Sequence, residues 1–81
     1  MNIRIENLPP GVTKDEVWEF LGESHDIEDI LLSDAGNSED VIAVLKVKTG
    51  HTGAVAIAEF IDGRYFRDRR LSAQAMTLLN E

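Results

Sequence analysis

Arginines and aromatic residues are interleaved in one short segment, Gly63-Arg64-Tyr65-Phe66-Arg67-Asp68-Arg69-Arg70-Leu71. Guanidinium groups pair with phosphates or carboxylates, and an exposed aromatic ring can stack on a nucleic-acid base. The segment therefore indicates contact with single-stranded nucleic acid or with an acidic partner. Equally, the same arginines can pair with acids of the chain itself, and such surface pairs contribute little to stability.

The sequence does not indicate catalysis. The chain has no cysteine, which excludes disulfides and thiolate metal sites. His25 and His51 lie in no metal-ligand spacing, and no nucleophile is paired with a base. We therefore expect a non-catalytic protein with no cofactor, no bound metal and no small-molecule substrate.

The net charge of −7 is unevenly distributed. Residues 1–62 hold 13 Asp and Glu against four Lys and Arg, whereas residues 63–81 hold four Arg against two acids. An acidic body repels phosphate, so nucleic-acid contacts are expected to be few and weak.

Eighty-one residues with 43% hydrophobic side chains are expected to form one folded domain over 1–81. No apolar run is long enough to span a membrane, and the first residues do not resemble a signal peptide. We expect a cytoplasmic location, or a nuclear one in a eukaryote.

The first half of the chain shows two strand patterns and one helix pattern. Residues 2–7 alternate apolar and polar side chains, the period of a half-buried strand. Thr13 followed by Glu16 matches a capping box, so we expect a helix over about 14–22. Its last residue, a glycine, is expected to be the C-cap. Residues 27–32 suggest a second strand.

The second half predicts strand, helix and strand. Residues 41–48 have the strongest strand composition of the chain. Residues 49–53, Thr-Gly-His-Thr-Gly, predict a break before a helix over 54–61. A last strand is expected from 69 to about 75, and the apolar tail 76–79 extends it or forms a terminal turn.

The expected order is β-α-β-β-α-β, the split βαβ (ferredoxin-like) α+β sandwich, with two helices covering one face of a four-stranded antiparallel sheet. The other face is then open. Strand alternation predicts which side chains point outward on it: Arg4, Glu6, Leu31, Ile42, Val44, Lys46, Ser72, Gln74 and Met76. The aliphatic members of this set would form an apolar patch, which in a small protein usually marks an interface.

This order resembles the RNA recognition motif (RRM) family over nearly the whole chain. The run Ile3-Arg4-Ile5-Glu6-Asn7-Leu8-Pro9 is similar to the motif of the family's first strand. A helix opening at Thr13, a strand opening at Ile27 and the segment 63–71 also lie in the family's register. The resemblance implies an RRM-like fold and an RNA-binding sheet face.

At the family's stacking positions this chain has Arg4, Ile42 and Val44, none of which is aromatic. Each missing ring forfeits about 1–3 kcal/mol of stacking per base. Arg4 retains a planar guanidinium that can stack on a base or pair with a phosphate.

Two branches of the family also lack these aromatics. A peptide-binding class has an acidic first helix and an Arg-x-Phe motif before the last strand, to which Arg64-Tyr65-Phe66 is similar. In that class a ligand tryptophan inserts near the Phe and the helix acids hold basic ligand residues. The quasi-RRM class has an arginine at the position of Arg4 and grips guanine-rich single strands with its loops.

We therefore expect weak binding of single-stranded RNA through a set of cationic, aromatic and aliphatic side chains: Arg4, Ile42, Val44, Lys46, Arg64, Tyr65, Arg67, Arg69 and Arg70. The alternative is a protein-interaction domain. In one form it binds a peptide through Glu16, Glu19, Glu23, Arg64 and Phe66. In the other form it dimerises through the aliphatic sheet face.

Overall fold

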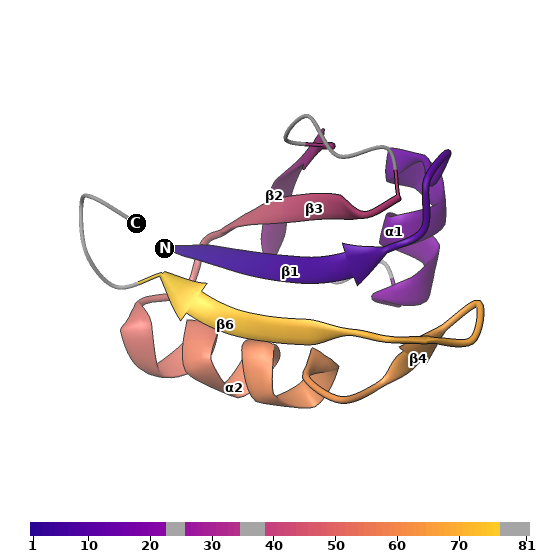
Figure 1. Cartoon of the computed structure of the whole chain (residues 1–81). Helices are drawn as coiled ribbons and strands as arrows, with labels where there is room; N and C mark the ends of the chain where they lie inside the picture. The colour runs from indigo at the N-terminus through magenta and orange to yellow at the C-terminus, as the bar shows by residue number, and fades with distance from the viewer. Residues whose placement is uncertain (23–25, 35–38, 77–81) are drawn as a thin grey trace.

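The sheet is the centre of the fold. A computed structural model describes residues 1–22, 26–34 and 39–76. Four antiparallel strands pair in the order β2-β3-β1-β6 (Figure 1). They are β1 (Asn2–Leu8), β2 (Ile27–Ser33), β3 (Val41–Val47) and β6 (Ser72–Met76). This confirms the predicted four-stranded antiparallel sheet.

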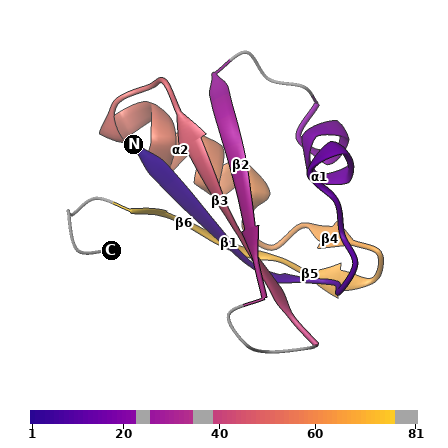
Figure 2. The same ribbon diagram turned by 90° about the horizontal axis from the view of Figure 1, so that it is seen from above.

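Both helices cover the same face of this sheet (Figure 2). Helix α1 (Lys14–Phe20) packs against β2, and α2 (His51–Ile61) packs against β1 and β6. Among the described residues, the buried side chains are all apolar and include Ile3, Ile5 and Leu45 from the sheet. Within the described residues, neither helix is long and apolar enough to cross a membrane.

The start of α1 is the predicted capping box. The Thr13 hydroxyl accepts a hydrogen bond from the Glu16 backbone N–H (3.2 Å), and the Glu16 carboxylate accepts one from the Thr13 backbone N–H (2.9 Å). The helix ends at Phe20, with Leu21 as C-cap and Gly22 following at φ 79°. The expected range 14–22 was thus two residues too long.

Thr13→Ala is expected to lower the free energy of unfolding by about 1 kcal/mol, because the Glu16 backbone N–H loses the hydroxyl that caps it. Urea denaturation measures this difference. Thr52→Ala is the matched control, since Thr52 is an exposed residue within α2. An equally large loss in the control would contradict the capping explanation.

The start of α2 corrects the sequence-based expectation. The helix begins at His51 and not at residue 54, so the predicted break at 49–53 was wrong over its last three residues. Its N-cap, Gly50, offers no side-chain hydrogen bond. Gly53 lies inside the helix, where an added Cβ would come within 2.6 Å of the Thr49 Cβ. The glycine is therefore needed for close approach to Thr49 and does not break the helix.

The last predicted strand is divided in two. A short hairpin pairs β4 (Tyr65–Phe66) with β5 (Arg69–Arg70), and the buried Leu71 separates it from β6. The two residues of its turn, Arg67 and Asp68, have φ of 50° and 65°. A two-residue turn with positive φ at both positions matches the right-handed twist of the two strands that it joins. The expected strand from 69 to about 75 is therefore interrupted at Leu71, so that Arg69 and Arg70 pair in the hairpin and only 72–76 join the four-stranded sheet. The tail 77–79 lies outside the described residues.

Candidate nucleic-acid interface

The open face of the sheet carries the side chains that alternation predicted. None of the nine predicted outward residues is buried, whereas their neighbours Ile3, Ile5, Ala43 and Leu45 are at most 1% exposed. Strand pairing aligns one residue from each strand in a row across the face: Leu31, Val44, Arg4 and Gln74. Arg4 is therefore the cation at the centre of the face. The aliphatic Val44 and Leu31 lie on one side of it, and the polar Gln74 lies on the other.

Arg4 is the central group of this row. Its side chain is 42% exposed, and one terminal nitrogen, Nη2, lies 3.9 Å from the Glu6 carboxylate. Its Nε is buried and has no hydrogen-bond partner among the described residues. A hollow of about 200 Å³ beside it is lined by Arg4, Gln74, Ala75 and Met76. A planar cation next to a hollow suits a base or a phosphate.

The aliphatic part of the face lies on one side of Arg4. Leu31 is 59% exposed and is paired with Val44, while Ile42 is paired with Ser33 on the same two strands. Met76 lies beyond β1, on the opposite edge strand. The apolar patch therefore consists of Leu31, Ile42 and Val44, and β1 separates it from Met76.

Lys46 supplies the second cation of the face. It is exposed, and strand pairing places it between Asp29 on β2 and Asn2 on β1. The Asp29 carboxylate accepts a hydrogen bond from the Ile30 backbone N–H (2.8 Å). Lys46 is therefore available for a phosphate, although a carboxylate faces it across the strand pair.

The arginines of the segment 63–71 are held by different partners. The Arg64 guanidinium lies over two rings on the helical side, 5.1 Å from the Phe20 centroid and 4.6 Å from the Phe60 centroid. Arg67 is ion-paired with Glu16 and lies 5.2 Å from the Phe66 centroid. Both therefore belong to the side of the molecule that carries the helices.

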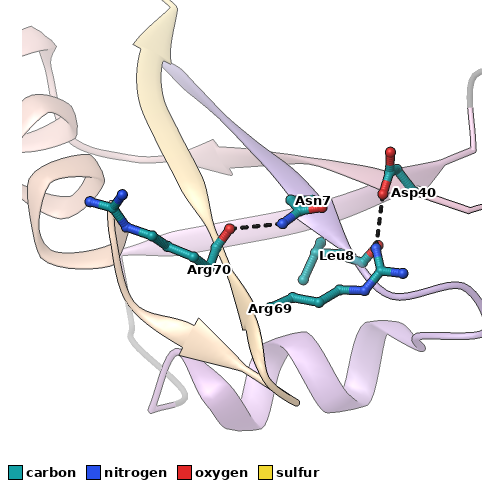
Figure 3. A network of polar contacts seen from close by, with 5 residues as sticks. All are labelled: Asn7, Leu8, Asp40, Arg69 and Arg70. Atoms are coloured by element: carbon teal, nitrogen blue, oxygen red, sulfur yellow. Dashed lines mark hydrogen bonds and ion pairs between the residues drawn. The ribbon is translucent and has the colours of Figure 1, made fainter.

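Arg69 and Arg70 point in different directions from the hairpin (Figure 3). Arg69 Nη1 donates to the Asp40 carboxylate (2.8 Å) and more weakly to the Leu8 carbonyl (3.4 Å). The Arg70 side chain lies beside Gly63, while its carbonyl accepts from Asn7 Nδ2 (2.9 Å). These arginines are therefore close in sequence, but their side chains do not point in a common direction.

Tyr65 is the most exposed of the large apolar side chains described, at 67%. It belongs to the β4–β5 hairpin, where it pairs with Arg70, and not to the four-stranded sheet. Its ring is therefore exposed for contact with a ligand.

The peptide-binding alternative corresponds to a second hollow, of about 380 Å³, between α1 and the hairpin. Its lining is Glu16, Glu19, Phe20, Phe66 and Arg67. The rings of Phe20 and Phe66 meet edge to face at 5.3 Å between centroids. Glu16 is already engaged by the Thr13 cap and by Arg67, Arg64 is not in the lining, and Glu23 lies outside the described residues.

Sequence reasoning missed Asp40 and Phe60. Asp40 meets Arg69 from a distant part of the chain, so no local pattern indicates the pair. Phe60 is 63% exposed on α2. The signal that could have indicated this exposure is the position of a large apolar residue beside the charged Glu59. Among the described residues, no group of three or more His, Asp or Glu could hold a metal ion.

These features define the class of protein: an α+β sandwich of the split βαβ type, with one sheet face that none of the described elements covers. The chain has the fold of an RNA recognition motif. It is similar to the solved structure of Pes4 RRM3, with a TM-score of 0.80 and 26% identity, covering 99% of this chain and 95% of that one. It is also similar to Mip6 RRM3, with a TM-score of 0.74 and 17% identity over 89% of this chain and 87% of that one.

Sequence comparisons alone give no relative. No protein-family model matches the sequence, and no curated protein is significantly similar to it.

Proposed function

We propose that this domain is a non-catalytic binding module that binds single-stranded RNA through its open sheet face. The observation that carries the proposal is the row across the four strands, with the Arg4 guanidinium at its centre. The RRM fold supports it, because in that fold the open face is the surface that receives bases. A shared fold does not by itself establish a shared function, so the proposal rests on the Arg4 side chain.

Arg4 stacks on a base or pairs with a phosphate, and Lys46 pairs with a neighbouring phosphate. Ile42 and Val44 contact base edges and riboses without stacking. Because none of the three stacking positions has an aromatic ring and the body is acidic, binding is weak. Tyr65, the exposed ring of the β4–β5 hairpin, offers a second contact for a longer strand.

The salt dependence of binding tests how many cations take part. For single strands, the slope of log K against log salt is about −0.7 per phosphate engaged. Contacts by Arg4 and Lys46 alone predict a slope of about −1.4, whereas engagement of the four arginines of the segment 63–71 as well predicts about −4. Fluorescence anisotropy with a labelled pool of random single-stranded RNA measures the slope. Absence of binding at low salt would refute the proposal.

Amide-shift NMR with the same RNA pool locates the contact. Shifts on β1 and β3 are expected, and they should diminish as salt is raised. Shifts confined to the helices would place the nucleic acid elsewhere and contradict the proposed face.

A second candidate function is peptide binding in the hollow between α1 and the hairpin, favoured by the paired rings of Phe20 and Phe66. Glu19 is the exposed acid of this hollow and would hold a basic ligand residue. Titration with a short peptide carrying one tryptophan flanked by arginines tests it. Glu19→Arg should abolish such binding, and an unchanged affinity would exclude this site.

Self-association through the aliphatic patch of Leu31, Ile42 and Val44 is the remaining form of the alternative. It predicts a mass that increases with concentration and returns to the monomer value in Val44→Asp. Sedimentation equilibrium measures this, and a monomer at millimolar concentration would exclude it.

A further inference from the structure

The open sheet face has a cation at each end of β3. Lys46 lies at one end, in the outward row that continues through Val44 and Ile42. Asp40 directly precedes β3 and has the same alternation as this row, so it lies at the other end of the face. The Arg69 guanidinium reaches this end from the hairpin and contacts the Asp40 carboxylate (Figure 3). The face is therefore flanked by Lys46 and Arg69.

Arg69 differs from Lys46 because its charge is paired within the chain. Its Nη1 donates to Oδ1 of Asp40 at 2.8 Å, the length of a charge-assisted hydrogen bond, and lies 3.4 Å from the Leu8 carbonyl oxygen. The pair is not buried, since the Arg69 side chain is 31% exposed and that of Asp40 is 46% exposed. An ion pair in contact with water is weak enough for another anion to replace one partner.

A phosphate is the anion that would replace the Asp40 carboxylate. A guanidinium donates to carboxylate and phosphate oxygens with the same fork of N–H groups. At about 3.3 Å per residue, Asp40 lies roughly 13 Å along β3 from Val44, which neighbours Arg4 in the central row. A single strand that has a base at Arg4 and runs along β3 therefore brings a phosphate to Arg69.

We propose that Asp40 competes with RNA for Arg69 and so limits the affinity of the open face, an inference that rests on the proposed RNA-binding function. While Asp40 holds Arg69, the face binds phosphate through Arg4 and Lys46 alone. Asp40 also repels an approaching phosphate by its own charge. The residue is thus a determinant of RNA affinity that acts through the cation it occupies.

Asp40→Asn is expected to tighten RNA binding about two- to fivefold, the range set by an exposed ion pair. The amide keeps the size of the side chain and removes the charge that holds Arg69. Glu39 is exposed directly before Asp40 and keeps its charge in the variant, which limits the gain. The slope of log K against log salt should steepen from about −1.4 to about −2.1, because one more phosphate is engaged.

Fluorescence anisotropy with a labelled pool of random single-stranded RNA, over a series of salt concentrations, measures both quantities. Glu59→Gln is the matched control, since it removes one carboxylate charge at an exposed position of α2, on the other side of the molecule. It should leave the slope unchanged and alter the affinity much less. Thermal melts verify that each variant is folded.

A double-mutant cycle shows whether the gain passes through Arg69. Adding Arg69→Gln to Asp40→Asn should return the affinity and the slope to those of the unmodified protein. The Nε–H resonance of Arg69 gives a second readout by NMR. It should shift when RNA is added to Asp40→Asn, and much less when RNA is added to the unmodified protein.

The outcomes separate this inference from the function on which it rests. If the unmodified protein binds RNA and Asp40→Asn changes neither affinity nor slope, Asp40 does not compete and only the inference is overturned. A gain that persists without Arg69, or that Glu59→Gln reproduces, would overturn it too, because net charge alone would then explain the effect. If neither the unmodified protein nor Asp40→Asn binds RNA at low salt, the proposed function fails together with the inference.

Discussion

Val44→Phe is expected to tighten the binding of single-stranded RNA by roughly five- to 150-fold, the equivalent of about 1–3 kcal/mol for one stacked base. Val44 occupies the middle of the open face, between Leu31 on β2 and Arg4 on β1. A phenylalanine ring has a π-face that valine lacks. Because this position is partly exposed and lies next to a cation, a base can reach that face. Fluorescence anisotropy at fixed salt compares the two proteins.

The control for Val44→Phe is Thr52→Phe, which adds the same ring at an exposed position of α2, on the other side of the molecule. It should not change the affinity for RNA. An unchanged affinity of Val44→Phe, with the fold intact by circular dichroism, would show that bases do not reach the centre of this face.

Arg4→Glu is expected to weaken RNA binding at least tenfold, or about 1.4 kcal/mol. The substitution removes the central guanidinium and places a second carboxylate beside Glu6, which repels phosphate. The lost ion pair with Glu6 is exposed and contributes little to folding, so the effect should be on binding. The same anisotropy titration measures it, and a thermal melt verifies folding.

Two further variants show what Arg4 contributes. Lys14→Glu makes the same change of charge at an exposed position in the first turn of α1 and should have a much smaller effect. Arg4→Lys keeps the charge and loses the planar group. Retained affinity would assign Arg4 to a phosphate, and reduced affinity would assign it to a base. Equal losses for Arg4→Glu and Lys14→Glu would mean that only net charge matters.

The strand pattern made the sheet predictable. A half-buried strand alternates with a period of two, and one slip would move every apolar residue to the wrong face. This is why Ile3 and Ile5 could be assigned to the core and Arg4 to the open face before the structure was known. The capping box of α1 was equally readable, because both of its partners lie within four residues.

Tertiary packing determines the local structure at the positions where the predictions from sequence were wrong. Gly53 was interpreted as part of a break, but packing against Thr49 allows no Cβ there, so the glycine is tolerated inside α2. The hairpin turn at Arg67 and Asp68 has none of the glycine or asparagine that normally indicates positive φ. Arg67 contacts the ring of its neighbour Phe66 and is ion-paired with Glu16, a residue that no local window includes.

The cationic part of the candidate site was the hardest to predict. Four arginines within seven residues suggest one basic surface, but a side chain's direction depends on distant partners. Asp40 engages Arg69, and the rings of Phe20 and Phe60 engage Arg64. Arg4 was easier, because the regular geometry of a strand fixes the face on which its side chain lies.

The position of β1 in the sheet has a consequence for how the chain folds. Asn2 faces Lys46 on one side and Met76 on the other, so the first strand gains its two neighbours only after distant segments have been synthesised. Pairing across such separations must close large loops before any contact compensates for the lost entropy, which slows folding relative to helical bundles. During synthesis Ile3 and Ile5 therefore remain without partners, and β1 is the segment most exposed to aggregation or to binding by a chaperone.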